Sequence, residues 1–155
     1  PEGMELPDHI KSRMAETNVR LKQMANAVGL EMVFATRIPN TRIAHEATEY
    51  ARQKGKGFEF HHAVFDKFYG RGEDVSKWDV LRDAALQVGL DADEMQREVV
   101  AGKYTATVNA LVKEASQIGV TGVPTYVLND RYAIVGAQPY EASLQALEQI
   151  KKEQK

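Results

Sequence analysis

The strongest constraint on this fold is a proline that stands at the start of a β-type run. Pro124 follows the loop 119–123 and directly precedes Thr125-Tyr126-Val127-Leu128. Because proline has no N–H to donate, Pro124 must lie at the first residue of a strand or on a sheet edge. Two glycines in the loop permit positive φ and close approach by another backbone. The Val123–Pro124 bond is also a candidate for the cis isomer. By local chemistry alone, the stretch is a helix stop, a turn and a strand start.

A short β-β-α unit follows this loop. The runs 125–128 and 132–135 are separated by Asn129-Asp130-Arg131, which predicts a hairpin because Asn and Asp tolerate a left-handed turn. A helix is expected to start at Pro139, with an apolar face made by Leu144, Leu147 and Ile150. The two strands should therefore pair, with a helix after them.

The chain before this loop is dominated by helical patterns. Residues 41–117 predict five helices with short connections, with Asn40 or Thr41 as the first N-cap and Asp91 as a later one. A helix of about 21 residues is expected to start at Pro7 and to stop before Gly29, and Glu31–Thr36 is expected to be extended or a strand. The aromatic residues of the second helix (Phe58, Phe65, Phe68, Tyr69) and Trp78 of the third are expected to lie in the core, and the fifth helix is expected to bury Val108, Leu111, Val112 and Ala115.

These patterns divide the chain into three expected parts. Residues 1–40 form a linker helix and a short extended segment, residues 41–118 an all-helical insertion, and residues 119–155 the β-β-α unit. No internal repeat and no low-complexity linker separates them.

Composition excludes several kinds of site. The net charge is −2 with both signs interspersed, so no basic face for nucleic acid or anionic membrane is expected. No apolar run approaches the roughly 18 residues of a membrane span. There is no cysteine, which excludes disulfides, thiolate zinc sites and cysteine nucleophiles within these residues. None of the four histidines forms a helical zinc motif. We therefore expect no metal and no cofactor.

Three separated motifs resemble one family. Arg37-Ile38-Pro39-Asn40-Thr41, followed by Ala44-His45, resembles the R-x-P-N-T-x-x-A-H stretch of the FrnE-like branch of the bacterial-type DsbA oxidoreductases. The loop 119–125 resembles that family's cis-proline loop, and the stretch 131–139 resembles its last strand and the start of its last helix. The motifs occur in the right order along nearly the whole chain.

The resemblance implies an α/β, thioredoxin-like fold with an all-helical insertion. It also implies disulfide exchange through a C-x-x-C pair at a helix N-terminus, where the thiol pKa is lowered. Val123 and Pro124 would contact the substrate through their backbone, Thr121 would neighbour the disulfide, and Asn40 and His45 are further substrate-binding candidates. The family's N-terminal β-α-β unit does not precede Pro1, so the chain is expected to be mostly α, without catalytic residues and redox-inactive.

The expected partners are protein or small thiol and disulfide substrates. A two-stranded hairpin alone is marginal in water, so a dimer or a strand swap is also expected. The FrnE-like branch favours a cytoplasmic location.

Other interpretations stay open at this point. Asn40 also suits a helix N-cap, and His45 a partly buried structural histidine. A glutathione-dependent isomerase or kappa-class transferase relative shares the insertion and the proline loop. A non-enzymatic peptide-binding or chaperone-like module is the second rival.

Overall fold

The structure is a computed structural model that describes residues 3–5, 7–34 and 37–153. Within the first long helix, the side chains of residues 8–10, 12 and 13 lie outside the described part. The chain divides into two compact units, residues 1–109 and residues 110–155. Each unit has its own sheet of two strands.

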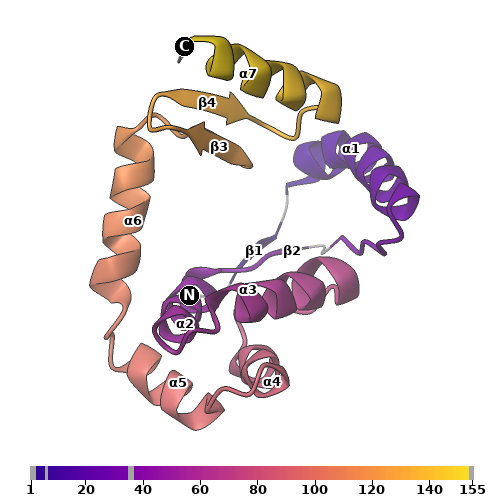
Figure 1. Cartoon of the computed structure of the whole chain (residues 1–155). Helices are drawn as coiled ribbons and strands as arrows, with labels where there is room; N and C mark the ends of the chain where they lie inside the picture. The colour runs from indigo at the N-terminus through magenta and orange to yellow at the C-terminus, as the bar shows by residue number, and fades with distance from the viewer. Residues whose placement is uncertain (1–2, 6, 35–36, 154–155) are drawn as a thin grey trace. The chain divides into compact units, whose positions relative to one another are not determined.

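The first unit is mainly helical (Figure 1). A short strand β1 (Met4–Glu5) precedes α1 (Asp8–Ala27), and β2 (Arg37–Ile38) pairs with β1 in antiparallel fashion. The helices that follow are α2 (Arg42–Gln53), α3 (Gly57–Phe65), the π-helix η1 (Asp66–Gly70), α4 (Trp78–Gln87) and α5 (Ala92–Val100). The helix α6 (Thr105–Gln117) begins in this unit and ends in the second.

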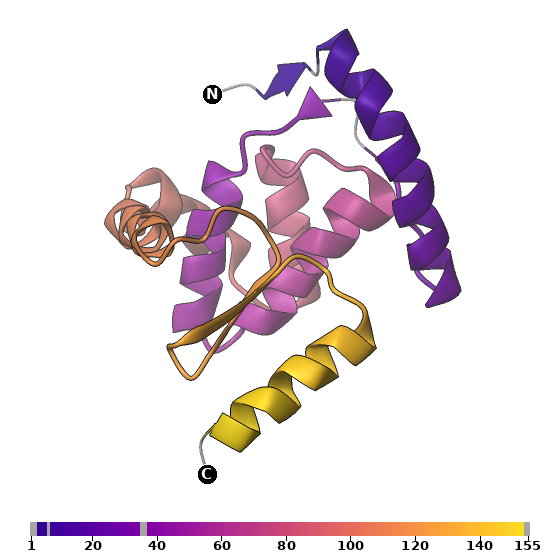
Figure 2. The same ribbon diagram turned by 90° about the horizontal axis from the view of Figure 1, so that it is seen from above.

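The second unit is the expected β-β-α arrangement. Strands β3 (Thr125–Leu128) and β4 (Tyr132–Val135) form an antiparallel hairpin in which Thr125 faces Val135 and Leu128 faces Tyr132. Asn129 and Asp130 adopt positive φ at its turn, as the sequence indicated. The helix α7 (Tyr140–Glu153) follows the hairpin (Figures 1 and 2). Tyr132 on β4 donates a hydrogen bond of 2.5 Å to Glu153 near the end of α7.

Five helices end in the same way. In each, the residue after the C-cap is a glycine with positive φ, and the two N–H groups beyond the cap donate to carbonyls of the last turn, which is the Schellman motif. After α1, for example, Gly29 N donates to Asn26 O and Leu30 N to Ala25 O. The glycines concerned are Gly29, Gly55, Gly89, Gly102 and Gly119. The sequence therefore marks the ends of α1, α2, α4, α5 and α6.

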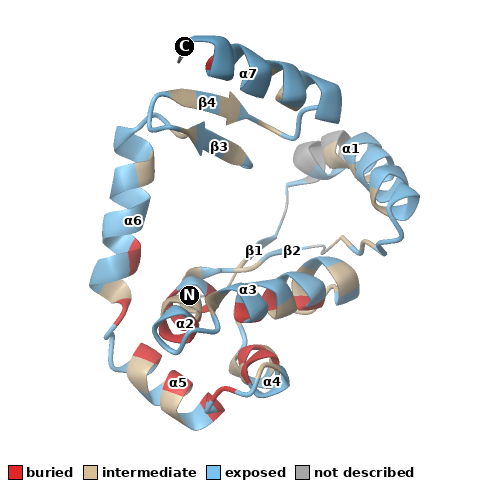
Figure 3. Ribbon diagram, viewed as in Figure 1, coloured by how far each residue is buried: buried red, intermediate tan, exposed pale blue. Residues whose placement is uncertain are grey.

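The core lies almost entirely in the first unit. Figure 3 shows the buried positions on α2 to α5 and at the start of α6. Tyr50, Phe60, Leu81, Met95 and Tyr104 are the largest apolar side chains that are fully buried there. In the second unit, Ile150 on α7 is the buried hydrophobic residue among those described.

Of the two alternatives for Glu31–Thr36, an extended segment or a strand, the strand is wrong over the described part. Residues 31–34 form no strand, and residues 35 and 36 lie outside the described residues. The strand is Arg37–Ile38 instead, because β1 pairs there. Residues 31–34 bond elsewhere, since Val33 N donates to Tyr69 O of η1 at 2.7 Å.

The buried face expected for the aromatic helix is also wrong at several positions. Phe58 is 81% exposed and Phe65 is about half exposed, while Phe60 and Val64 are buried. The periodicity was therefore assigned to the wrong side of α3. Phe68 and Trp78 do pack against the core.

The apolar stripes of two further helices are exposed where burial was expected. On α6, Val108 is buried but Leu111 and Val112 are exposed, because they follow the point at which the helix leaves the first unit. On α1, Leu21, Met24 and Val28 are exposed. The stripe of α1 is thus not docked through these residues within the first unit.

Candidate functional site

The Val123–Pro124 loop joins α6 to β3 in the second unit. Gly119 ends α6 with a φ of +80°, and the Val123–Pro124 peptide bond is cis. Pro124 comes directly before the first residue of β3, as its missing N–H requires. Pro124 O accepts a hydrogen bond of 2.7 Å from Gly136 N, and Thr125 Oγ1 donates to Gly122 O at 2.7 Å. These two bonds hold the loop on the hairpin.

The loop leaves main-chain groups available to a partner. Val123 is 88% exposed. Among the described residues, neither Val123 nor Thr121 uses its backbone N–H or C=O in a backbone hydrogen bond. Backbone polar groups bind either water or a partner, and an extended peptide can take these positions as an added strand does. The arrangement is therefore suited to binding an extended chain.

Asn40 and His45 lie at the start of α2 in the first unit. Asn40 Oδ1 accepts a hydrogen bond from Arg42 N at 3.0 Å, while the N-cap residue Thr41 makes no side-chain cap. Asn40 thus satisfies a free backbone N–H at the start of α2, which is the kind of structural role that the sequence suggested for it. His45 is exposed on α2, one turn after Thr41, and not partly buried. Thr121, Val123 and Pro124 belong to the second unit, and Asn40 and His45 to the first.

His61 is a titratable residue near His45 that the sequence did not single out. Desolvation lowers the pKa of His61, and the positive charges of His45, Arg52 and His62 lower it further. Its ring lies 4.4 Å from the ring of Phe65, measured between centroids. Adjacent histidines at 61 and 62 were visible in the sequence, but the electrostatic effect of His45 on His61 depends on the packing of α3 against α2.

Polar groups inside the first unit tie its helices together. Glu46 is buried and accepts from Arg42 Nε at 2.8 Å and from Thr105 Oγ1 at 2.9 Å. Arg42 also donates to Asn109 Oδ1 at 2.8 Å. The contacts join α2 to the first turns of α6, so the charges of Arg42 and Glu46 are both engaged by the protein itself.

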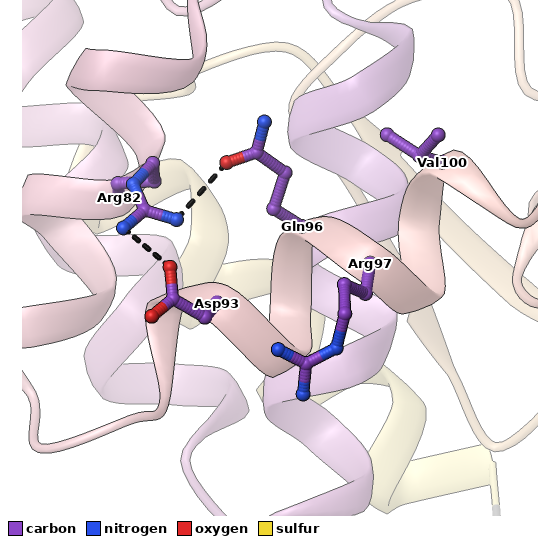
Figure 4. A pocket seen from close by; sticks show the side chains of 5 residues that line it. All are labelled: Arg82, Asp93, Gln96, Arg97 and Val100. Carbon is purple, nitrogen blue, oxygen red and sulfur yellow. Dashed lines mark hydrogen bonds and ion pairs between the residues drawn. The ribbon is translucent and has the colours of Figure 1, made fainter.

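A pocket of about 340 Å³ lies on α4 and α5 (Figure 4). Arg82, one of its lining residues, forms an ion pair with Asp93 Oδ1 at 2.6 Å and donates a hydrogen bond to Gln96 Oε1 at 3.0 Å. Both bonds are drawn in Figure 4. Arg82 is therefore engaged by the protein itself, and the pocket is a groove beside an ion pair that links the two helices.

The described residues hold no group of three or more His, Cys, Asp or Glu side chains placed to bind a metal ion. No helix among them is long and apolar enough to cross a membrane.

Comparison with known proteins agrees with this architecture. The sequence profile described as "DSBA-like thioredoxin domain" matches residues 1–148. The uncharacterized protein YwbO of Bacillus subtilis (strain 168) is 28% identical over 126 residues, which are 79% of this chain and 62% of that protein. The chain thus spans less than two thirds of the length of this relative.

Two solved structures resemble the fold closely. A probable DsbA oxidoreductase from Streptomyces coelicolor superposes with a TM-score of 0.81 at 31% identity, over 92% of this chain and 62% of that one. A 2-hydroxychromene-2-carboxylate isomerase superposes with a TM-score of 0.79 at 19% identity, over 94% of this chain and 70% of that one, which shows a shared fold. The thioredoxin-like, mostly helical architecture expected from the sequence is thereby confirmed. The chain belongs to the family of DSBA-like thioredoxin domains.

Proposed function

We propose that this chain supplies the substrate-binding part of a protein thiol-disulfide oxidoreductase of the FrnE-like branch. The observation that carries the proposal is the Val123–Pro124 loop, which is held on the hairpin while the backbone groups of Thr121 and Val123 make no backbone hydrogen bond to a described residue. An extended substrate segment would bind there by main-chain hydrogen bonds. Membership of the family supports this role.

The chemistry assigned to the family is thiol-disulfide exchange. A thiolate attacks one sulfur of a substrate disulfide, a mixed disulfide forms, and the other substrate sulfur leaves as a thiolate. A second thiol then breaks the mixed disulfide. These 155 residues contain no cysteine, so the chain alone has no atom that can take part in either step. We propose that it is redox-inactive by itself and that its contribution is binding.

A turnover assay tests the absence of redox activity. The purified chain is added to insulin and dithiothreitol, and precipitation of the reduced B chain is followed by turbidity. The expected rate equals that of dithiothreitol alone, because no protein thiolate is available. Turnover above this background from a homogeneous sample would contradict the proposal.

A binding experiment tests the loop. Reduced and S-alkylated insulin B chain is titrated into the ¹⁵N-labelled chain, and the amide signals of Thr121 and Val123 are expected to shift. Val123→Asp should weaken binding by about tenfold, because a carboxylate that must be desolvated would lie against the peptide. The matched control is Val112→Asp on α6, another exposed valine, which should leave the affinity unchanged. Equal affinities of wild type and Val123→Asp would overturn the assigned role.

Asn40 and His45 are proposed as additional substrate contacts. The same titration examines them, since His45 is exposed and its ring signals can be followed separately. If the peptide shifts the loop signals but leaves both Asn40 and His45 unchanged, these two residues serve only the start of α2.

The alternative is that the chain belongs to a relative of the glutathione-dependent isomerases or kappa-class transferases. Glutathione that binds in a parallel titration while the alkylated peptide does not would favour it over the oxidoreductase.

We also propose that the second unit pairs with another chain. Val127 and Val135 are exposed on the hairpin, and a two-stranded sheet is marginal alone. Light scattering coupled to gel filtration should show a dimer that dissociates on dilution. A monomer at all concentrations would contradict self-association.

A further inference from the structure

A second pocket lies wholly within the first unit, between η1 and the described residues 33, 34, 37–39 and 41. Its volume is about 330 Å³, and its walls include Phe34, Ile38, Pro39, Phe68 and Tyr69, with Arg37 among the lining residues. We call it the β2–η1 pocket. All the atoms that line it come from the first unit, so its shape is set within one compact body.

The wall formed by η1 is held from several sides. A π-helix is rare and occurs frequently at functional sites, because its wider turn displaces side chains from their α-helical positions. Here the turn carries Phe68 and Tyr69, whose rings meet edge to face at 4.7 Å between centroids. Val33 N donates to Tyr69 O at 2.7 Å, which attaches the opposite wall to the same turn.

The η1 turn is also held in place by a buried lysine. Lys67 lies within η1 and is only 1% exposed. Its ammonium group forms ion pairs with Asp83 of α4 and with Glu73. Glu73 N in turn donates to Lys67 O at 2.9 Å. On the other side, Arg37 and Ile38 are placed by the β1–β2 ladder. The pocket is thus bounded by constrained backbone on both sides.

The charge of the pocket is positive. Among the described residues that line it, Arg37 is the one with a charge, and no described carboxylate forms an ion pair with Arg37. Arg37 Nη2 donates to Gly3 O at 3.0 Å, which uses one of its five N–H groups. Arg37 acts electrostatically on Asp74, but the Asp74 carboxylate already accepts hydrogen bonds from the N–H and the hydroxyl of Ser76. The pKa of Asp74 is lowered by these hydrogen bonds first, and by Lys77 and Arg37 as smaller causes.

We propose that the β2–η1 pocket binds a small monocarboxylate with an apolar body. The aromatic and aliphatic walls match an apolar body, and a guanidinium matches a carboxylate through paired N–H donors. A volume of about 330 Å³ is at the lower end of small-molecule sites. At about 30 Å³ per water-sized group it holds roughly ten non-hydrogen atoms, the size of octanoate.

The proposed site requires no thiol and no residue of the second unit. The two proposals can therefore fail separately, because the disulfide-exchange proposal depends on Thr121, Val123 and Pro124 of the second unit.

Calorimetric titration with two matched probes tests the charge. Octanoate should bind the full chain, and 1-octanol, with the same chain length and no charge, should bind at least about tenfold more weakly. Arg37→Gln should remove this preference and leave octanol binding unchanged. The control is Arg97→Gln on α5, which deletes an exposed guanidinium of the same unit and should leave both affinities unchanged. Equal binding of the two probes by the wild type, or equal effects of the two arginine variants, would overturn the proposal.

A filling variant tests the location. Val33→Trp places an indole in the pocket and should abolish binding of both probes, while Val28→Trp, at the exposed end of α1 outside the pocket, should not. Thermal midpoints of both variants establish that each is folded. If a folded Val33→Trp protein still binds octanoate, the assigned site is contradicted. The proposal is also contradicted if an amidated apolar peptide, which has no carboxylate, competes for the pocket as well as octanoate does.

Discussion

Tyr50 and Tyr104 show how single residues hold the first unit together. Their rings meet edge to face at 6.3 Å inside the core, and each hydroxyl donates to a glutamate of α5, from Tyr50 to Glu94 at 2.7 Å and from Tyr104 to Glu98. Lys54 and Lys103 complete the two groups with ion pairs of 2.8 Å and 2.7 Å. Burial first, and then the acceptor carboxylate, raise the pKa of each tyrosine well above its usual value.

Removal of the Tyr104 hydroxyl should change stability in a pH-dependent way. Because the folded pKa is raised, the hydroxyl's contribution is fully present below the unfolded value of about 10 and is lost as pH rises above it. Tyr104→Phe should cost about 1–2 kcal/mol at pH 7, and this cost should shrink between pH 9 and 11. Urea unfolding across that range measures it. Tyr126→Phe, at an exposed position on β3, is the control with no expected effect. A cost that does not vary with pH would contradict the assigned cause.

Lys67 tests whether its buried stem or its charge anchors η1. Lys67→Ala removes both and should cost about 2–3 kcal/mol, while Lys67→Met keeps the stem and should cost much less, because Asp83 is exposed enough to be solvated. Lys77→Met, at an exposed lysine of the following loop, should be neutral. Chemical denaturation measures all three. Equal losses for Ala and Met would show that the ion pairs dominate.

At the scale of elements, the helix ends were the most predictable features. Asp91 was assigned as the N-cap of α5, and its Oδ1 accepts from Asp93 N at 2.9 Å and Glu94 N at 2.8 Å. Caps and glycine stops depend on the local backbone, so a single sequence is enough to find them. Buried faces were less predictable, as the exposed Phe58 and Leu111 show, because the burial of a helix face depends on which other element packs against it.

Asp91→Ala should lower the thermal midpoint by a few degrees at pH 7. The hydrogen bonds from Glu94 N and Asp93 N lower the pKa of Asp91, so the cap stabilises the fold above the unfolded pKa of about 4 and is lost as pH falls through the folded value. The difference from the wild type should therefore disappear in strong acid. Asp79→Ala, in the first turn of α4, lacks these bonds and should have a smaller effect. Calorimetry at pH 7 and pH 2 separates the two, and an effect of equal size at both pH values would exclude a charged cap.

At the scale of the whole molecule, burial is unevenly distributed between the two units. Large apolar side chains fill the space among α2, α3, α4 and α5, whereas the hairpin and α7 keep most of theirs exposed. Opening free energy follows buried apolar contact, so the two units should differ in protection.

Hydrogen exchange should show this difference. Amides in the middle of α2 and α5 are expected to exchange at least about a hundredfold more slowly than those of β3, β4 and α7, because their opening exposes the core. Mass spectrometry of peptides from each element measures it, with α1 as an internal reference because its Leu21 and Met24 are exposed. The exchange is measured at concentrations at which the proposed dimer is dissociated, and equal protection in both units under that condition would contradict the prediction.

What the sequence determined by itself was local. The proline at the start of β3, the turn at Asn129, the glycines after five helices and the cap at Asp91 each follow from backbone chemistry within a few residues. The motifs at Arg37 and at Pro124 also sufficed to indicate the family. The structure alone decided what depends on distant contacts: the strand at Arg37–Ile38, which exists because Met4–Glu5 pairs with it, and the inner face of α3. The electrostatic effect of His45 on His61 and the β2–η1 pocket likewise arise from segments far apart in the chain, which no local pattern specifies.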